Sequence, residues 1–315
     1  MKTKLFKLSL LLTAFAMLTL SSCKKDDNST DDSVSAQDHG NISGAMNSVS
    51  DDATSALGQV QSLSGKTDGV HIVMCGATVI TTDTANKTIT INYDGTTNCG
   101  GFKRSGTATV TMTSSTQHWK DPGAQLTVTF NGLQVTSIGT GETYTLSGTH
   151  TVTNESGGLA WQIMNQVVVN ATVIHRHTGQ MDVTFPDNTH RTWTVDRTRK
   201  FVSSSASGTN VVTVSLYAEG VNNIDATGTN RRGDTFTNSI PTAITSSSTS
   251  TACGNNWMRK PTSGNFKHEV GNRSLDIVYG VDANGSPVTS GCPYGYQITF
   301  TRAGHQKTKV VQYWQ

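Results

Sequence analysis

Residues 106–113 read Gly-Thr-Ala-Thr-Val-Thr-Met-Thr, and this stretch decides the fold class. Threonine occupies every second position, and Ala108, Val110 and Met112 stand between the threonines. A period of two places alternate side chains on opposite faces of a strand, and β-branched threonine suits the wet face of a pleated surface. The stretch therefore predicts an antiparallel strand with one face buried and the other in water.

The same alternation recurs along most of the chain, for example over residues 88–93, 126–130, 143–152 and 296–301. Turn sequences separate these stretches, namely Asp94-Gly95, Asp121-Pro122-Gly123, Asn131-Gly132, Thr178-Gly179, Pro186-Asp187-Asn188 and Asn284-Gly285. Counting by alternation gives about thirteen to fifteen strands. No repeat of fixed period is present, which disfavours a solenoid or a propeller.

We therefore predict an all-β fold over residues 61–315, built as one large antiparallel sheet. A β-sandwich and a rolled half-barrel are both compatible with the pattern. The Ser/Thr-rich stretch at 240–252 is either a loop or a boundary before a C-terminal section. We favour one continuous β domain.

A short N-terminal helix is predicted over residues 33–60. Apolar residues recur there at helical spacing: Val34, Ile42, Met46, Val49, Ala53 and Leu57. Gly40 and Gly44 weaken this helix, because each glycine costs about 1 kcal/mol relative to alanine. The polar face carries no lysine or arginine, which argues against a helix lying on a membrane. We expect an amphipathic helix packed on the β domain or on a partner.

The first 23 residues have the order of a bacterial lipoprotein signal. Lys2, Lys4 and Lys7 precede an apolar run over residues 8–20, and Ser21 and Ser22 then precede Cys23. We expect residues 1–22 to be a signal peptide and Cys23 to carry the lipid, with an ordinary cleaved signal as the alternative. The charged residues 23–32 are expected to be a disordered tether.

Maturation also changes the charge balance. The full chain has a formal net charge of +2, and cleavage would remove three lysines and no acidic residue, leaving the mature chain near −1. This near-neutral chain contains no basic run, so nucleic acid is not an expected partner.

The four remaining cysteines are Cys75, Cys99, Cys253 and Cys292. An even number in an exported chain indicates disulfides, and four cysteines allow three pairings. Local pairing, Cys75–Cys99 and Cys253–Cys292, needs the least rearrangement of the chain. A four-cysteine metal site is the alternative, but it lacks the Cys-x-x-Cys spacing.

Three histidines are candidate metal ligands. His175 and His177 share one strand face, and His190 follows on a nearby strand. A hairpin turning at Thr178-Gly179 would set Asp182 opposite His175 as a further ligand or supporting carboxylate. Two ordinary surface histidines are the alternative, and we expect no cofactor. His150 lies at an apolar position and is expected to be a hydrogen-bonded core residue.

No catalytic motif is present, and the glutamates at 142, 155, 219 and 269 are scattered. Trp119 and Trp257 are candidate sugar-stacking residues, although packing is the commoner use of tryptophan. The threonine faces offer unreactive hydroxyls that can bind a glycan or a surface protein. We expect a non-catalytic binding or structural protein, with a surface glycan-acting enzyme or a carbohydrate-binding protein as the alternative.

The chain resembles a family of uncharacterised Bacteroidota lipoproteins. The resemblance is carried by the lipobox and the short helix, by residues 98–106, by Asp121-Pro122-Gly123, by residues 147–154, and by Thr192-Trp193-Thr194 with Arg197-Thr198-Arg199. The chain departs from the family at His150, where an arginine is expected. The resemblance implies an all-β body and an outer-membrane location but no activity. Lys24-Lys25-Asp26-Asp27 also resembles the export signal of such surface lipoproteins, which implies a membrane-anchored protein that faces outward, with a periplasm-facing one as the alternative.

Overall fold

All strands in the part of the chain that the structure describes belong to one antiparallel sheet. The structure, a computed structural model, describes residues 27–65, 74–114, 116–206, 209–248, 257–258 and 260–313. The strand order is β1-β2-β3-β4-β5-β6-β7-β8-β10-β11-β12-β13-β14, and β9 pairs with β7 and β10 beside that path. The predicted all-β fold is confirmed, and the 14 described strands lie within the predicted number.

The strands are long in the middle of the sheet and shorter towards its edges. Their bounds are β1 (Ala77–Asp83), β2 (Thr88–Asp94), β3 (Phe102–Met112), β4 (Ala124–Ser137), β5 (Thr143–Asn154), β6 (Ala171–Thr184), β7 (His190–Ala206), β8 (Thr209–Ala218), β9 (Ile224–Thr229), β10 (Thr235–Ser247), β11 (Ser263–Val270), β12 (Arg273–Val281), β13 (Gly295–Arg302) and β14 (His305–Gln312). Residues 240–247 of the Ser/Thr-rich stretch therefore belong to a strand, while 249–256 lie outside the described residues.

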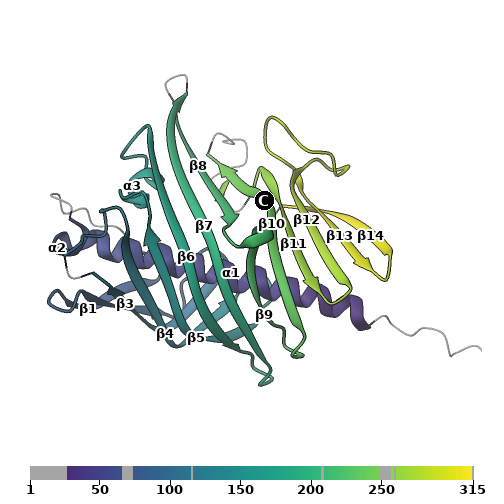
Figure 1. Cartoon of the computed structure of the whole chain (residues 1–315), viewed down its shortest axis with the longest axis horizontal. Coiled ribbons are helices and arrows are strands. Elements are labelled where there is room, and N and C mark those ends of the chain that lie inside the picture. The colour runs from purple at the N-terminus through teal and green to yellow at the C-terminus, as the bar shows by residue number, and fades with distance from the viewer. Residues whose placement is uncertain are drawn as a thin grey trace, which may run out of the picture.

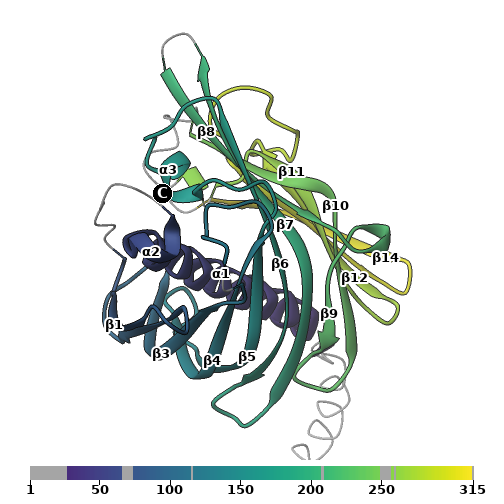
Figure 2. The same ribbon diagram turned by 60° about the vertical axis from the view of Figure 1, so that its left-hand side comes forward.

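The sheet curls around a long helix, α1 (Asp27–Gln59), which crosses its concave face (Figures 1 and 2). Three short helices complete the fold: α2 (Gln61–Ser64), α3 (Ala160–Met164) and the 3-10 turn η1 (Val221–Asn223). A single curled sheet with a helix inside matches the rolled half-barrel and rules out the sandwich. The predicted helix packs within its own β domain.

Helix α1 is longer than the sequence pattern predicted. It begins at Asp27 rather than at residue 33, so its first turns fall within the segment expected to be a disordered tether. Its apolar stripe is buried from Ile42 onward, since Ile42, Met46, Val49, Ala53 and Leu57 are at most 1% exposed. These residues join the core formed by the inward positions of β2–β7, such as Ile89, Val110 and Val128. Val34, which was predicted to begin the stripe, is 40% exposed.

Two dipeptides that were predicted as turns lie inside strands. Thr178-Gly179 is in the middle of β6, where Gly179 pairs with His150, and Asn131-Gly132 forms an irregularity within β4. Glycine within these strands allows the backbone of a neighbouring strand to come close. A Cβ on Gly148, whose φ is +124°, would approach the carbonyl oxygen of Gln180 to 2.5 Å. Glycine inside a strand and glycine in a turn give the same sequence signal.

The disulfide Cys75–Cys99 is confirmed, with the two Cα atoms 5.6 Å apart. It encloses the β1–β2 hairpin, as the local pairing predicted. Cys292 is also disulfide-bonded, and Cys253, its predicted partner, lies outside the described residues. Residues 1–22 and Cys23 lie outside them as well, so the leader and its lipid stay a prediction.

Candidate functional site

The polar face of α1 lies against the sheet and is buried at Ser35, His39 and Ser43, whereas Asp51 at its end is 52% exposed. Its polar residues follow one another at intervals of four and share one side of the helix: Ser35, His39, Ser43, Asn47 and Asp51. On the sheet, three arginines and two apolar residues occupy the inward positions of β7, in the order Arg191, Trp193, Val195, Arg197 and Arg199. The arginines of β7 thus meet the polar side of the helix.

Each of these arginines bonds to a different turn of α1. Arg197 donates to Ser43 Oγ at 2.6 Å and to Asn47 Oδ1 at 3.2 Å. Arg191 donates to the backbone oxygen of Ser35 at 2.9 Å, and Arg199 donates to Asp51 at 2.7 Å. A shift of α1 along its axis or about it would break these bonds together, because each arginine donates to a specific group on the helix. This set of bonds holds α1 at one height and one rotation in the half-barrel.

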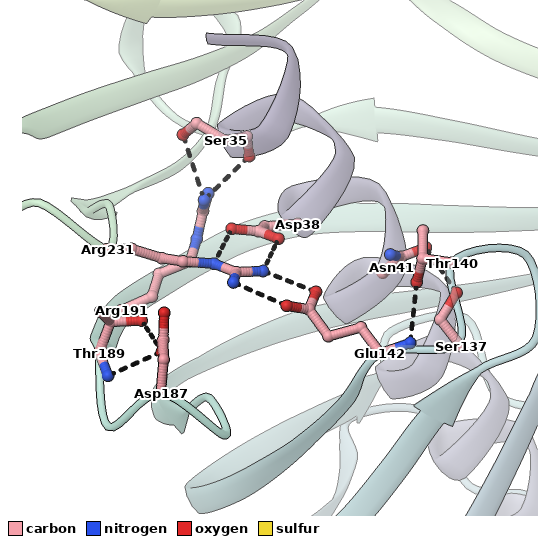
Figure 3. A network of polar contacts seen from close by, with 10 residues as sticks. All are labelled: Ser35, Asp38, Asn41, Ser137, Thr140, Glu142, Asp187, Thr189, Arg191 and Arg231. Carbon is pink, nitrogen blue, oxygen red and sulfur yellow. Dashed lines mark hydrogen bonds and ion pairs between the residues drawn. The ribbon is translucent and has the colours of Figure 1, made fainter. Parts of the chain in front are cut away.

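A second anchor lies near the start of α1 (Figure 3). Arg231, in the turn between β9 and β10, makes paired bonds to Asp38 at 2.6 and 2.8 Å and to Glu142 at 2.6 and 2.7 Å. Burial alone would lower the pKa of Arg231, but the two carboxylates outweigh burial and raise it. The guanidinium of Arg231 therefore lies between the carboxylates of Asp38 and Glu142.

A chain of buried polar groups continues from β11 to α1. His268 Nδ1 donates to Asn238 Oδ1 at 2.6 Å, and Asn238 Nδ2 donates to His39 Nδ1 at 2.7 Å. On its other side, His39 Nε2 lies 3.5 Å from Asp225, whose second oxygen lies 3.7 Å from Arg197. Because His39 Nδ1 accepts a hydrogen bond, His39 is neutral.

The pKa directions agree with this geometry. Burial lowers the pKa of His39 despite the nearby Asp225, and it lowers the pKa of His268 to about 3. Burial opposes ionisation of Asp225, yet Arg197 and His39 hold the pKa of its carboxyl below its usual value. This row of polar groups therefore contains one buried ion pair, Arg197–Asp225, and the two histidines in the row, His39 and His268, are neutral.

This polar chain borders a cavity of about 710 Å³ between α1 and the C-terminal half of the sheet. Ala36, Gly40, Ser43 and Gly44 line it on the helix side. The opposite wall is mainly apolar, with Leu216, Ile240, Ile244, Phe266 and Ile277. Volumes of about 300–1,000 Å³ with apolar walls and a few polar groups are typical of small-molecule sites.

Three tyrosines form one end of this cavity. The rings of Tyr279 and Tyr296 lie 5.9 Å apart, and those of Tyr296 and Tyr313 lie 5.7 Å apart. Tyr313 donates to the backbone oxygen of Pro261 at 2.7 Å. Burial raises the pKa of Tyr279 and of Tyr296, so both hydroxyls stay protonated and can donate. The wall thus offers aromatic faces with neutral donors.

The histidines singled out in the sequence do not form a metal site. His175 and His177 are buried rather than on the surface, and His177 Nδ1 lies 3.0 Å from His150 Nε2. His190 lies at the far end of β6–β7, beside Thr184. Within the described ranges, no three metal-binding side chains converge. His150 is a hydrogen-bonded core residue, as predicted.

The predicted supporting groups are also elsewhere. Because β6 continues through Gly179, Asp182 pairs with Thr192 and Ser147, not with His175. Trp119 is fully buried against His175 and presents no ring for sugar stacking. Trp257 is partly buried and packs against the small cluster formed by α3, β6, β7 and β8, so sugar stacking on this ring stays a prediction. Glu142 is bound by Arg231, and Glu269 pairs with Lys267 at 2.6 Å.

The threonine faces line up across the convex side of the sheet. One rank runs through Thr81, Thr90, Thr109, Thr129, Thr149, Gln180, Thr194, Thr227 and Thr237. The rank follows the curve of the sheet, so its hydroxyls diverge instead of forming a flat plane. A glycan or surface-protein partner for this face stays a prediction.

Sequence reasoning missed the cavity and the buried side of α1. The helix pattern assigns no partner to its polar residues, although Arg191, Arg197 and Arg199 stand at inward positions of a strand and signal buried partners. No family model, curated protein or solved structure matches the chain. Across the described residues, no helix has both the length and the apolar character needed to cross a bilayer.

Proposed function

We propose that this chain is a non-catalytic, lipid-anchored binding protein of the outer membrane that holds an apolar small molecule between α1 and strands β10–β13. The cavity carries this proposal, because it combines about 710 Å³ of space with apolar and aromatic walls. Two of the charged groups that line it, Arg197 and Asp225, are paired with each other. That arrangement suits binding, since neither group is poised to give or take a proton.

Burial of apolar surface supplies the affinity. Each buried methylene contributes about 0.8 kcal/mol, so ten methylenes contribute roughly 8 kcal/mol at most. Losses of translational and side-chain freedom reduce this sum. We therefore expect dissociation constants in the micromolar range or weaker.

Gly40 provides the test of the cavity. A Cβ at Gly40 meets nothing within 4 Å, so a side chain there projects into open space. We expect Gly40→Ala to stabilise the helix by about 1 kcal/mol and to keep binding of the neutral dye Nile red. Gly40→Trp fills the cavity and is expected to weaken dye binding at least tenfold in a fluorescence titration.

Gly40→Ala is the matched control for that experiment, because it replaces the same residue but adds only a methyl group, which does not fill the cavity. Gly40→Leu gives an intermediate volume should the tryptophan variant fold poorly. Dye binding by a folded Gly40→Trp protein at wild-type affinity would contradict the proposed site.

The anchor is supported by the leader and by Cys23 directly after it. Several acyl chains hold a protein stably on a membrane, whereas one chain binds marginally. We expect Cys23→Ala to move the protein from the membrane fraction to the soluble fraction without changing its melting temperature. Fractionation and Triton X-114 partitioning of the two proteins measure this. Unchanged detergent partitioning would refute the lipid anchor.

A further inference from the structure

Strands β12–β14 present two chemically different faces. Ile277 and Tyr279 line the cavity, and residues directly opposite in an antiparallel pair lie on the same face. Ile277 pairs with Ile298, which pairs with Lys309. One row of the cavity-side face therefore runs from the cavity wall to a lysine on the edge strand.

The next row repeats the pattern. Leu275 pairs with Phe300, and Phe300 pairs with Lys307. Ile298 and Phe300 are only partly buried, so an apolar surface continues from the cavity towards β14. At the right-hand side of Figure 1 these strands form the end of the sheet.

The opposite face of the same strands is mainly polar. Its polar rows are Ser274–Thr301–Gln306 and Asp276–Thr299–Thr308, and the next row is Val278–Gln297–Val310. The two lysines are thus placed with the apolar residues, while Asp276 is on the other side of the sheet. Neighbouring strands lie about 4.8 Å apart, so Lys309 is roughly 10 Å from the cavity wall at Ile277.

Charge on this side of the sheet favours an anion. The cavity lining includes only one acidic residue, Asp225, and Arg197 already pairs with it. Lys307 and Lys309 are exposed on the edge strand. Both lysines lie outside the cavity lining, so a ligand reaches them only where it extends from the cavity along the face of Ile298 and Phe300.

We propose that the ligand is a fatty acid, with its acyl chain in the cavity and its carboxylate bound by Lys307 and Lys309. This inference rests on the proposed function of the cavity and names the chemistry of the occupant. The chain runs along Ile298 and Phe300, which cover its exposed methylenes. The two ammonium groups neutralise the head group in a place where water also reaches it.

Lysines on edge strands have a second established use, since they discourage pairing between sheet edges. That use requires no ligand and makes no distinction between a carboxylate and an alcohol. The head group of the ligand is therefore the variable that separates the two roles.

The experiment compares displacement of Nile red by dodecanoate and by 1-dodecanol, which share one apolar chain. Each exposed ion pair contributes a factor of roughly 1.5–5 in affinity. We expect the wild-type protein to prefer dodecanoate about tenfold. In K307Q/K309Q the preference is expected to fall to about twofold, with affinity for dodecanol unchanged. K307R/K309R retains the charges and the preference.

Lys267→Gln is the matched control, because Lys267 lies opposite Asp276 on the polar face of the sheet and forms an ion pair with Glu269 there. Where the double glutamine variant aggregates, Lys309→Gln alone and wild-type protein in 0.5 M salt replace it, and both are expected to lower the preference. Equal affinity for acid and alcohol in the wild type, or a full preference in K307Q/K309Q, would overturn the fatty-acid inference. Dye displaced by neither compound would overturn it too. Failure of the dye itself to bind would instead contradict the proposed function.

Discussion

Lowering the pH from 7.5 to 5 is expected to remove at least about 5 kcal/mol from the free energy of unfolding. Burial lowers the pKa of His150, His175 and His268 to about 3 in the folded protein. In the unfolded chain a histidine has a pKa of about 6.5. Between these two pH values the unfolded state binds a proton that the folded state does not. The free energy of unfolding therefore decreases as the pH is lowered.

The magnitude follows from this difference. At pH 5 each of the three histidines destabilises the fold by about 2 kcal/mol. Burial raises the pKa of Asp52 to about 6 despite its bond to Arg104, which acts in the opposite direction by about 1 kcal/mol. His39 and His177, whose pKa values burial also lowers, add to the loss.

Urea denaturation at pH 7.5, 6 and 5 measures the effect. His268→Gln is expected to reduce the difference between pH 7.5 and pH 5, whereas replacement of the exposed His305 is the matched control. A free energy of unfolding that stays within about 1 kcal/mol over this range would show that the histidines are not buried as described.

Asp225→Ala is expected to lose about 3–5 kcal/mol of unfolding free energy, because it leaves Arg197 buried without its counter-charge. Both side chains are 1% exposed, and Asp225 also faces His39. Guanidinium denaturation compares this variant with Asp234→Ala. Asp234 is 44% exposed in its pair with Arg232, so its loss is expected to cost at most about 1 kcal/mol.

The double variant D225L/R197M separates the missing charge from the missing contacts. Replacing both members of a buried pair by apolar residues is often neutral. We expect the double variant to recover more than half of the loss. A double variant as unstable as Asp225→Ala would show that the ion pair is not the cause, and a single variant within 1 kcal/mol of wild type would contradict its burial.

The sheet was predictable because a period of two is a local signal. Stretches such as 106–113 identify their strands without any knowledge of partners. The face of His175 and His177 was also readable, since they share alternate positions with Val173, Met181 and Val183, all of which are buried. Treating His-x-His as a ligand motif obscured that simpler pattern.

The site could not be predicted, because it depends on which segments meet. Tyr279, Tyr296 and Tyr313 come from different parts of the chain, and their contact follows from strand register. The stripe Ser35–His39–Ser43 looks like a solvated helix face unless the arginines of β7 are known to lie opposite. Gly179 likewise gave a turn signal, although it lies within β6.

The central claim is that the space between α1 and strands β10–β13 is where the ligand binds. A fatty acid carrying a diazirine near the end of its chain tests this directly when it is photocrosslinked to residues 24–315 and the labelled peptides are mapped. We predict labels on cavity residues such as Phe266, Ile277 and Tyr296, and competition by unlabelled dodecanoate. Labels confined to the convex threonine face, or scattered without competition, would contradict the claim.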